Sequence, residues 1–109
     1  MILDNGTTIY VINDRSRFID ELWPSNDFVY AGTGLDPVEG IGTVAVIIQT
    51  PTGPKRILLA NAAYVPAFYT NLACLDKFNN KNIWWDNEKN LLYHKDDRKT
   101  FAYCERHCN

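Results

Sequence analysis

Residues 38–62 read VEGIGTVAVIIQTPTGPKRILLANA, which is two apolar runs on either side of a turn rich in Pro and Gly. Val and Ile dominate the first run, and β-branched side chains favour strands. The cluster Thr50-Pro51-Thr52-Gly53-Pro54 is typical of a connection between two antiparallel strands. We therefore predict a long hairpin at the centre of the fold, with strands over residues 38–49 and 55–62.

Short apolar segments separated by polar turns continue on both sides of this hairpin. They predict further strands over residues 28–31, 64–65, 82–85, 91–94 and 100–104. Two short helices are also expected, one over residues 15–22 with Asp14 as its cap and one over residues 72–80 with Asn71 as its cap. Pro24 would end the first of them. Many short strands with few helices indicate a mainly β fold, a compact barrel or sandwich.

The composition suits one soluble domain. The chain has 109 residues, 46% of them hydrophobic and 22% charged, with a formal net charge of -2. No basic stripe is present, so nucleic acid is not expected as a direct partner. The chain has no apolar run long enough to span a bilayer and its start lacks a signal pattern, so no membrane partner is expected.

The cysteines and the end of the chain bear on location and metal binding. Cys74, Cys104 and Cys108 are odd in number, which fits a reducing, intracellular and cytoplasmic setting. Cys104, His107 and Cys108 supply too few ligands for zinc at an unusual spacing, so no metal and no cofactor are expected. We treat residues 1–109 as one domain, with residues 102–109 a tail toward a downstream domain.

The tryptophans are expected either to pack in the core or to form an exposed binding patch. Trp84 and Trp85 alternate along a predicted strand, so at least one of them should point into the core. Trp23 is expected to pack the first helix against the sheet. An exposed binding patch is the alternative for the two adjacent tryptophans.

Residues 2–7, with the sequence ILDNGT, could carry chemistry. Two apolar residues deliver the carboxylate of Asp4 onto a turn, and Gly6 lets the backbone bend sharply. Asp-Asn-Gly is also an ordinary surface turn. The sequence around it decides between these two interpretations.

Three later stretches give this segment a context. They are EGIGTV over residues 39–44, LANAAYVP over residues 59–66 and NLACL over residues 71–75. In this order and spacing, the chain resembles the protease domain of copia-type retrotransposon Gag-Pol polyproteins, a branch of the retropepsin-like aspartic proteases. The resemblance extends from Ile2 to about Phe101. It implies a small closed retropepsin-like β-barrel with one or two short helices.

The resemblance also implies roles for individual residues. Asp4 matches the catalytic aspartate, followed by the active-site turn of Asn5, Gly6 and Thr7. The strand and hairpin expected to cover the substrate contain Gly40, Ile41 and Gly42, and the pair that packs beneath the catalytic loop is Leu72 and Ala73. The chain departs from the family at Asn5, where Ser or Thr is usual, and at Tyr10, where relatives often carry His.

Hydrolysis by this chemistry requires two carboxylates that share one proton. The chain offers a single Asp-x-Gly in an apolar setting, so activity requires a homodimer that brings two copies of Asp4 together. The substrate is then an extended peptide of the polyprotein, and an active element would place the enzyme in virus-like particles. The alternatives are a catalytically inactive β-barrel that serves as a spacer or interaction module, and a domesticated domain that binds peptides without cutting them.

Overall fold

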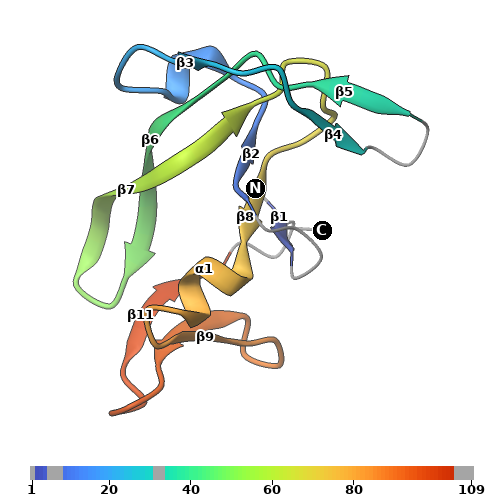
Figure 1. Ribbon diagram of the computed structural model, residues 1–109. Helices are drawn as coiled ribbons and strands as arrows, with labels where there is room; N and C mark the ends of the chain where they lie inside the picture. Colours follow the sequence, from blue (N-terminus) through green and yellow to red (C-terminus); the bar gives the residue numbers. More distant parts are fainter. Residues whose placement is uncertain (1, 5–8, 31–33, 105–109) are drawn as a thin grey trace.

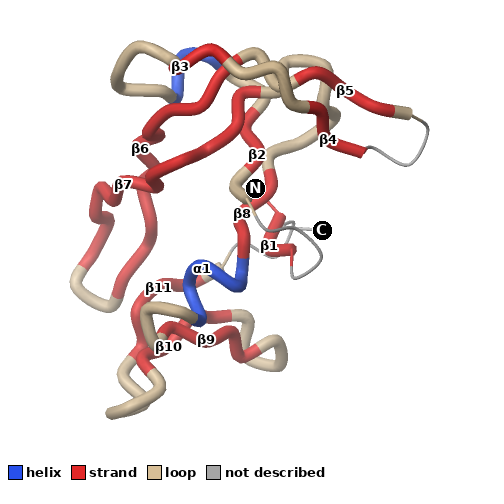
Figure 2. Tube along the Cα trace, viewed as in Figure 1, coloured by secondary structure: helices blue, strands red, loops and turns tan. Residues whose placement is uncertain are grey.

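The computed structural model describes residues 2–4, 9–30 and 34–104, and of residues 2–4 the backbone alone. Most of these residues form strands (Figures 1 and 2). The strands are β1 (Ile2–Asp4), β2 (Val11–Ile12), β3 (Trp23–Pro24), β4 (Phe28–Tyr30), β5 (Leu35–Pro37), β6 (Gly40–Thr50), β7 (Gly53–Tyr64), β8 (Leu72–Cys74), β9 (Ile83–Asp86), β10 (Leu91–His94) and β11 (Thr100–Tyr103). The helices are the 3-10 turn η1 (Arg15–Arg17) and α1 (Leu75–Asn79).

Nine of the strands belong to one curled sheet, in the order β1-β8-β2-β7-β6-β11-β10-β9, with β3 paired to the side of β6. Strands β4 and β5 form a separate two-stranded sheet. Figure 1 shows β3, β4 and β5 at one end of the molecule and the β9–β11 meander with α1 at the other. The predicted mainly β fold, a small barrel-like domain, is confirmed.

The predicted central hairpin is β6 and β7, which pair in antiparallel register from Gly40↔Tyr64 to Thr50↔Gly53. Gly53 has a φ of 109°, a conformation that side chains disfavour, and it closes the turn. The register shifts between Gly42 and Val44, and on the facing strand Asn61 has a φ of 58°. This bulge bends the hairpin and lets it follow the curl of the sheet.

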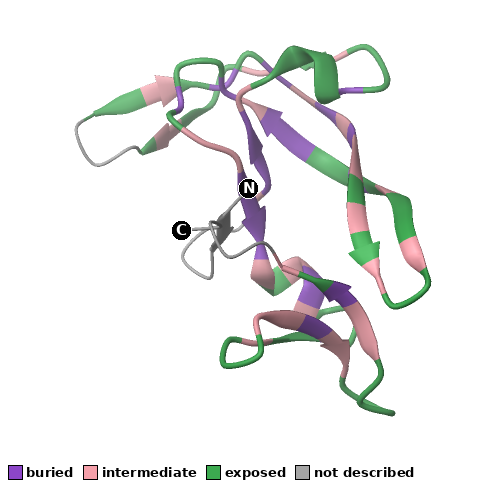
Figure 3. Ribbon diagram, turned by 180° about the vertical axis from the view of Figure 1, so that it is seen from behind, coloured by how far each residue is buried: buried purple, intermediate pink, exposed green. Residues whose placement is uncertain are grey.

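The core consists of two clusters on opposite sides of β2. Tyr10 and Ile12 belong to the first cluster, and Val11 belongs to the second. Successive side chains of a strand point to opposite faces, and here each face is covered by one of the two clusters. All three side chains are therefore buried. Seen from behind, the buried positions follow β2 and β8 through the middle of the molecule (Figure 3). Both strands are thus central supports of the fold.

Both predicted helices are shorter than expected. After η1, Phe18 bridges to Val44 on β6, and this contact replaces the rest of the helix expected over residues 15–22. Asp14 does cap η1, since its carboxylate accepts the N–H of Ser16 at 3.0 Å. In the second case residues 72–74 are strand β8, and α1 begins only at Leu75.

The tryptophan predictions were wrong. Trp23 is 77% exposed, because β3 lies at the rim of the sheet and only its backbone pairs with β6. Trp84 and Trp85 are each 37% exposed, and the buried side chain of β9 is Ile83. Within the described ranges, neither helix has the length and apolar character needed to cross a membrane.

Candidate functional site

Asp4 is the last residue of β1, which lies at one end of the sheet. Strand β1 runs parallel to β8, with Leu3 opposite Ala73 and Asp4 opposite Cys74. The chain therefore delivers Asp4 to the carboxyl end of a parallel strand pair. The predicted active-site turn of Asn5, Gly6 and Thr7 lies outside the described residues and stays a prediction.

Strand β8 gives β1 a buried neighbour. Leu72 packs in the second core cluster, whereas Ala73 and Cys74 pack in the first. All three side chains are buried. Helix α1 starts at Leu75, directly after the residue that pairs with Asp4. This placement is compatible with the predicted role of Leu72 and Ala73 beneath the loop after β1, and that role stays a prediction.

Tyr10, directly before β2, is a core residue. Its ring meets the ring of Phe78 edge to face, with the centroids 6.1 Å apart. The ammonium of Lys77 lies 4.7 Å from the centre of the Tyr10 ring, which is cation–π geometry. Burial, with a smaller contribution from Cys74, raises the pKa of the phenol to about 12. Tyr10 is therefore neutral at physiological pH and packs against α1.

The shifted pKa of Tyr10 predicts a loss of stability in alkali. A tyrosine of the unfolded chain titrates near pH ~10, so between about pH 10 and 12 the folded state holds one proton more. Stability therefore falls as the pH rises through this window. In Tyr10→Phe we expect that fall to be smaller by on the order of 1–2 kcal/mol, measured by urea unfolding across the window. Tyr69→Phe, at an exposed ring, should behave as the wild type, and parallel curves for both variants would contradict the assignment.

A pair of asparagines ties the end of β2 to the segment before β8. The backbone N–H of Asn13 donates to Asn71 Oδ1 at 2.8 Å. The side-chain amide of Asn13 donates to the carbonyl oxygen of Phe68 at 3.1 Å. Asn71 was expected to cap a helix and instead fixes the entry to β8. Sequence reasoning missed this pair because the partners are 58 residues apart.

Gly40, Ile41 and Gly42 begin β6, where the strand is paired on both sides. They pair with β7, and Ile41 and Gly40 also pair with Trp23 and Pro24 of β3. A Cβ on Gly40 would lie 2.6 Å from Leu22 Cβ, so the glycine permits the close approach of the segment before β3. The predicted substrate-covering role of this stretch is untested and stays a prediction.

Gly40→Ala should accordingly destabilise the domain. The added methyl group must displace Leu22 or the carbonyl of Trp23, and overpacking of this kind lowers the free energy of unfolding by about 1–3 kcal/mol. Chemical denaturation measures the change. Gly34→Ala is the matched control, because a Cβ at Gly34 meets nothing within 4 Å. Equal stability of the two variants would contradict this prediction, because it would show that Leu22 and Trp23 move aside without loss of free energy.

Other carboxylates of the described residues accept backbone N–H groups. Asp20 Oδ1 accepts the N–H of Thr43 at 3.2 Å, and Asp86 Oδ1 accepts the N–H of Lys89 at 3.0 Å. Hydrogen bonds from Ser16 lower the pKa of the Asp14 carboxyl below its usual value. The described part of the chain contains no group of three or more His, Cys, Asp or Glu side chains that could hold a metal ion. The terminal Cys-His-Cys cluster lies largely beyond that part, since residues 105–109 are outside it.

Comparison with known proteins identifies the family. The family model described as Pol polyprotein, beta-barrel domain matches residues 1–83, which includes β1, the β6–β7 hairpin, β8 and α1. No curated protein and no solved structure matches the chain. The matched region covers most of the chain and agrees with the mainly β architecture. The chain therefore belongs to the family of Pol polyprotein beta-barrel domains.

Proposed function

We propose that this domain is a copia-type retrotransposon aspartic endopeptidase that cleaves Gag-Pol polyprotein as a homodimer. The observation that carries the proposal is the position of Asp4 at the carboxyl end of β1, beside a buried strand that leads directly into a helix. A short apolar strand of this kind fixes the backbone of the residue that ends it. Membership of a Pol polyprotein family is consistent with this function.

The chemistry requires a second carboxylate close to the first. Two carboxylates about 3 Å apart cannot both ionise, so the pair shares one proton. The ionised member takes a proton from water, and the protonated member donates its proton to the oxygen of the scissile carbonyl. The resulting tetrahedral diol then breaks down, with the proton taken from water passing to the leaving amine.

The position of β1 in the sheet is compatible with supply of the second carboxylate by another copy of the chain. In the sheet order β1 is a terminal strand, with β8 on one side. A two-fold axis beside this strand would bring the two copies of Asp4 together in an isologous interface. The substrate in this proposal is an extended peptide held by backbone hydrogen bonds.

Activity should therefore depend on protein concentration. We would measure cleavage of a Gag-Pol polyprotein fragment at mildly acidic pH over a dilution series, with sedimentation of the same samples. Specific activity should rise in parallel with the dimer fraction, and pepstatin should abolish it. A monomeric chain without pepstatin-sensitive cleavage at any concentration would contradict the proposal. It would favour a catalytically inactive spacer or interaction module.

A further inference from the structure

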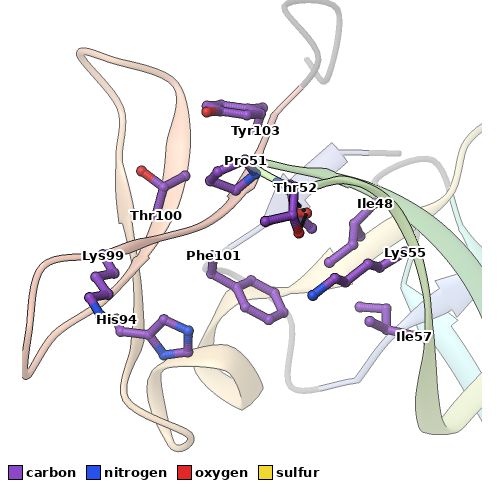
Figure 4. Close-up of a pocket in the computed structure, with 11 residues that line it drawn as sticks. Ile48, Pro51, Thr52, Lys55, Ile57, His94, Lys99, Thr100, Phe101 and Tyr103 are labelled. Atoms are coloured by element: carbon purple, nitrogen blue, oxygen red, sulfur yellow. Dashed lines mark hydrogen bonds between the residues drawn. The ribbon is translucent and has the colours of Figure 1, made fainter.

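A cleft separates the tip of the β6–β7 hairpin from β11. Its volume is about 690 Å³. Among the described residues, strands β6 and β11 pair at Tyr103↔Gln49 alone, so the pairing does not continue along residues 100–102. Figure 4 shows side chains of the two walls facing each other across the gap. The lining residues are Ile48, Thr50, Pro51, Thr52, Lys55, Ile57, His94, Lys99, Thr100, Phe101 and Tyr103.

The hairpin wall of the cleft is held in shape by its own hydrogen bonds. Thr50 Oγ1 donates to the carbonyl oxygen of Gly53 at 2.6 Å. Thr50 Oγ1 also accepts the N–H of Thr52 at 3.2 Å. This network fixes the turn before any ligand arrives, which lowers the entropy lost on binding.

The opposite wall is fixed by the turn between β10 and β11. The N–H of His94 donates to the carbonyl oxygen of Lys99 at 2.8 Å, and the N–H of Lys99 donates to Asp97 Oδ1 at 2.9 Å. The ring of Phe101 meets the His94 ring edge to face at 5.5 Å. Asp97 is thus used by the turn and does not line the cleft.

The cleft combines an apolar floor with basic groups. Ile48, Ile57 and Phe101 supply the apolar surface, and Lys55 and Lys99 supply ammonium groups. The Lys55 side chain extends toward Phe101 in Figure 4. Among the described residues, those that line the cleft include neither Asp nor Glu. The charge and the floor together favour a ligand that carries carboxylates and apolar side chains.

The edge of β11 favours an extended ligand over a compact one. On one side β11 pairs with β10 from Thr100 to Tyr103, with a register shift that leaves Phe101 between the pairs Leu92↔Ala102 and Tyr93↔Thr100. On the other side, in the described part of the chain, only Tyr103 pairs with β6. Residues 100–102 therefore present a strand edge to the cleft, and an edge of this kind accepts an added strand.

We propose that this cleft binds an extended acidic peptide that adds as a strand along β11. Its carboxylates lie near Lys55 and Lys99, and an apolar side chain packs on Phe101. None of the described residues that line the cleft belongs to β8, the strand that pairs with β1. The peptide is a docking partner of the domain and is not cleaved there.

Fluorescence polarisation with a labelled peptide of sequence Glu-Leu-Glu-Phe-Glu-Leu-Glu tests the proposal. The double variant Lys55→Glu, Lys99→Glu should bind the probe about tenfold or more weakly than the wild type, because like charges then face each other. The control Lys81→Glu, Lys89→Glu makes the same change in net charge at exposed residues that do not line the cleft, and it should bind nearly as the wild type at about 0.15 M salt. Equal weakening in both variants would overturn the proposal.

Matched probes separate strand addition from simple charge attraction. A version of the peptide that is N-methylated at alternate residues loses edge hydrogen bonds and should bind more weakly. Equal binding of that version, or of a version with Gln in place of every Glu, would overturn the proposal. Displacement of the probe by an equal concentration of phenylpropionate would also overturn it, since a small apolar acid would then suffice.

A single variant separates this site from catalysis. Lys99→Glu should weaken probe binding and keep the wild-type rate of cleavage of a short peptide substrate, because Lys99 lies between β10 and β11, outside the hairpin expected to cover the substrate. If cleavage by the domain is never observed, loss of probe binding in this variant still supports the cleft. If the probe does not bind the wild type, the cleft proposal fails and the role of Asp4 is unaffected.

Discussion

Asp4→Asn should reduce proteolysis by about 10²–10⁴-fold or more, because an amide can neither take a proton from water nor share one with a partner carboxylate. The measurement is the cleavage rate of a polyprotein fragment at mildly acidic pH. The wild-type rate should follow a bell-shaped pH profile, since one carboxylate of the pair must be ionised and the other protonated. Asp4→Asn should show no such profile.

Asp27→Asn is the matched control. Asp27 is exposed, and the hydrogen bonds of this residue are made by its backbone N–H and carbonyl. The variant makes the same chemical change at a position without a proposed role, so its activity should equal that of the wild type. Cleavage that persists at the wild-type rate in Asp4→Asn would falsify the assignment of Asp4.

Ile12→Ala should lower the free energy of unfolding by about 2–5 kcal/mol, a large part of the stability of a domain of this size. The Ile12 side chain is fully buried in the first core cluster. Its truncation leaves a cavity between strands that are themselves held by β2. Equilibrium unfolding in urea, followed by tryptophan fluorescence, measures the loss.

Ile47→Ala makes the same truncation at a solvent-facing position of β6, where the side chain is 62% exposed. We expect a change within about 0.5 kcal/mol. The comparison removes the difference in strand propensity between Ile and Ala, which both variants share. Similar losses at the two positions would mean that the packing around Ile12 is looser than its burial indicates.

The sequence predicted best what depends on neighbouring residues. The strand expected over residues 91–94 is β10, and the hairpin with its turn at residues 50–54 is β6 and β7. In these segments the apolar pattern and the turn residues indicate the same structure. Local preference and tertiary contacts agree there, and sequence reasoning succeeds.

Prediction from the sequence failed where contacts with distant segments compete with local preference. Residues 72–74 have an apolar spacing that suits a helix, but they pair with β1 and β2 and become β8. Short helices are only marginally stable by themselves, so the strand pairing is the more stable arrangement of these residues. Strand β2 was not predicted, because Val11–Ile12 is too short to show a period and gains its partners from β7 and β8.

The candidate site was predicted only in outline. The position of Asp4 at the end of an apolar strand follows from its two preceding residues, and the parallel partner of that strand does not. The contact between Asn13 and Asn71 and the close approach at Gly40 depend on segments that the chain brings together only in the folded state. The cleft beside β11 is likewise produced by a strand pair that separates, a feature without a sequence pattern.

The parallel pairing of β1 with β8 also governs when the domain can complete its fold during synthesis. Ile2 pairs with Leu72, which is translated 70 residues later, so β1 is synthesised long before its partner strand. Contacts of such sequence separation slow folding, because the loop between them must close first. A nascent Pol polyprotein therefore carries an unfinished domain until β8 has been translated, and the proposed protease can act only after that point.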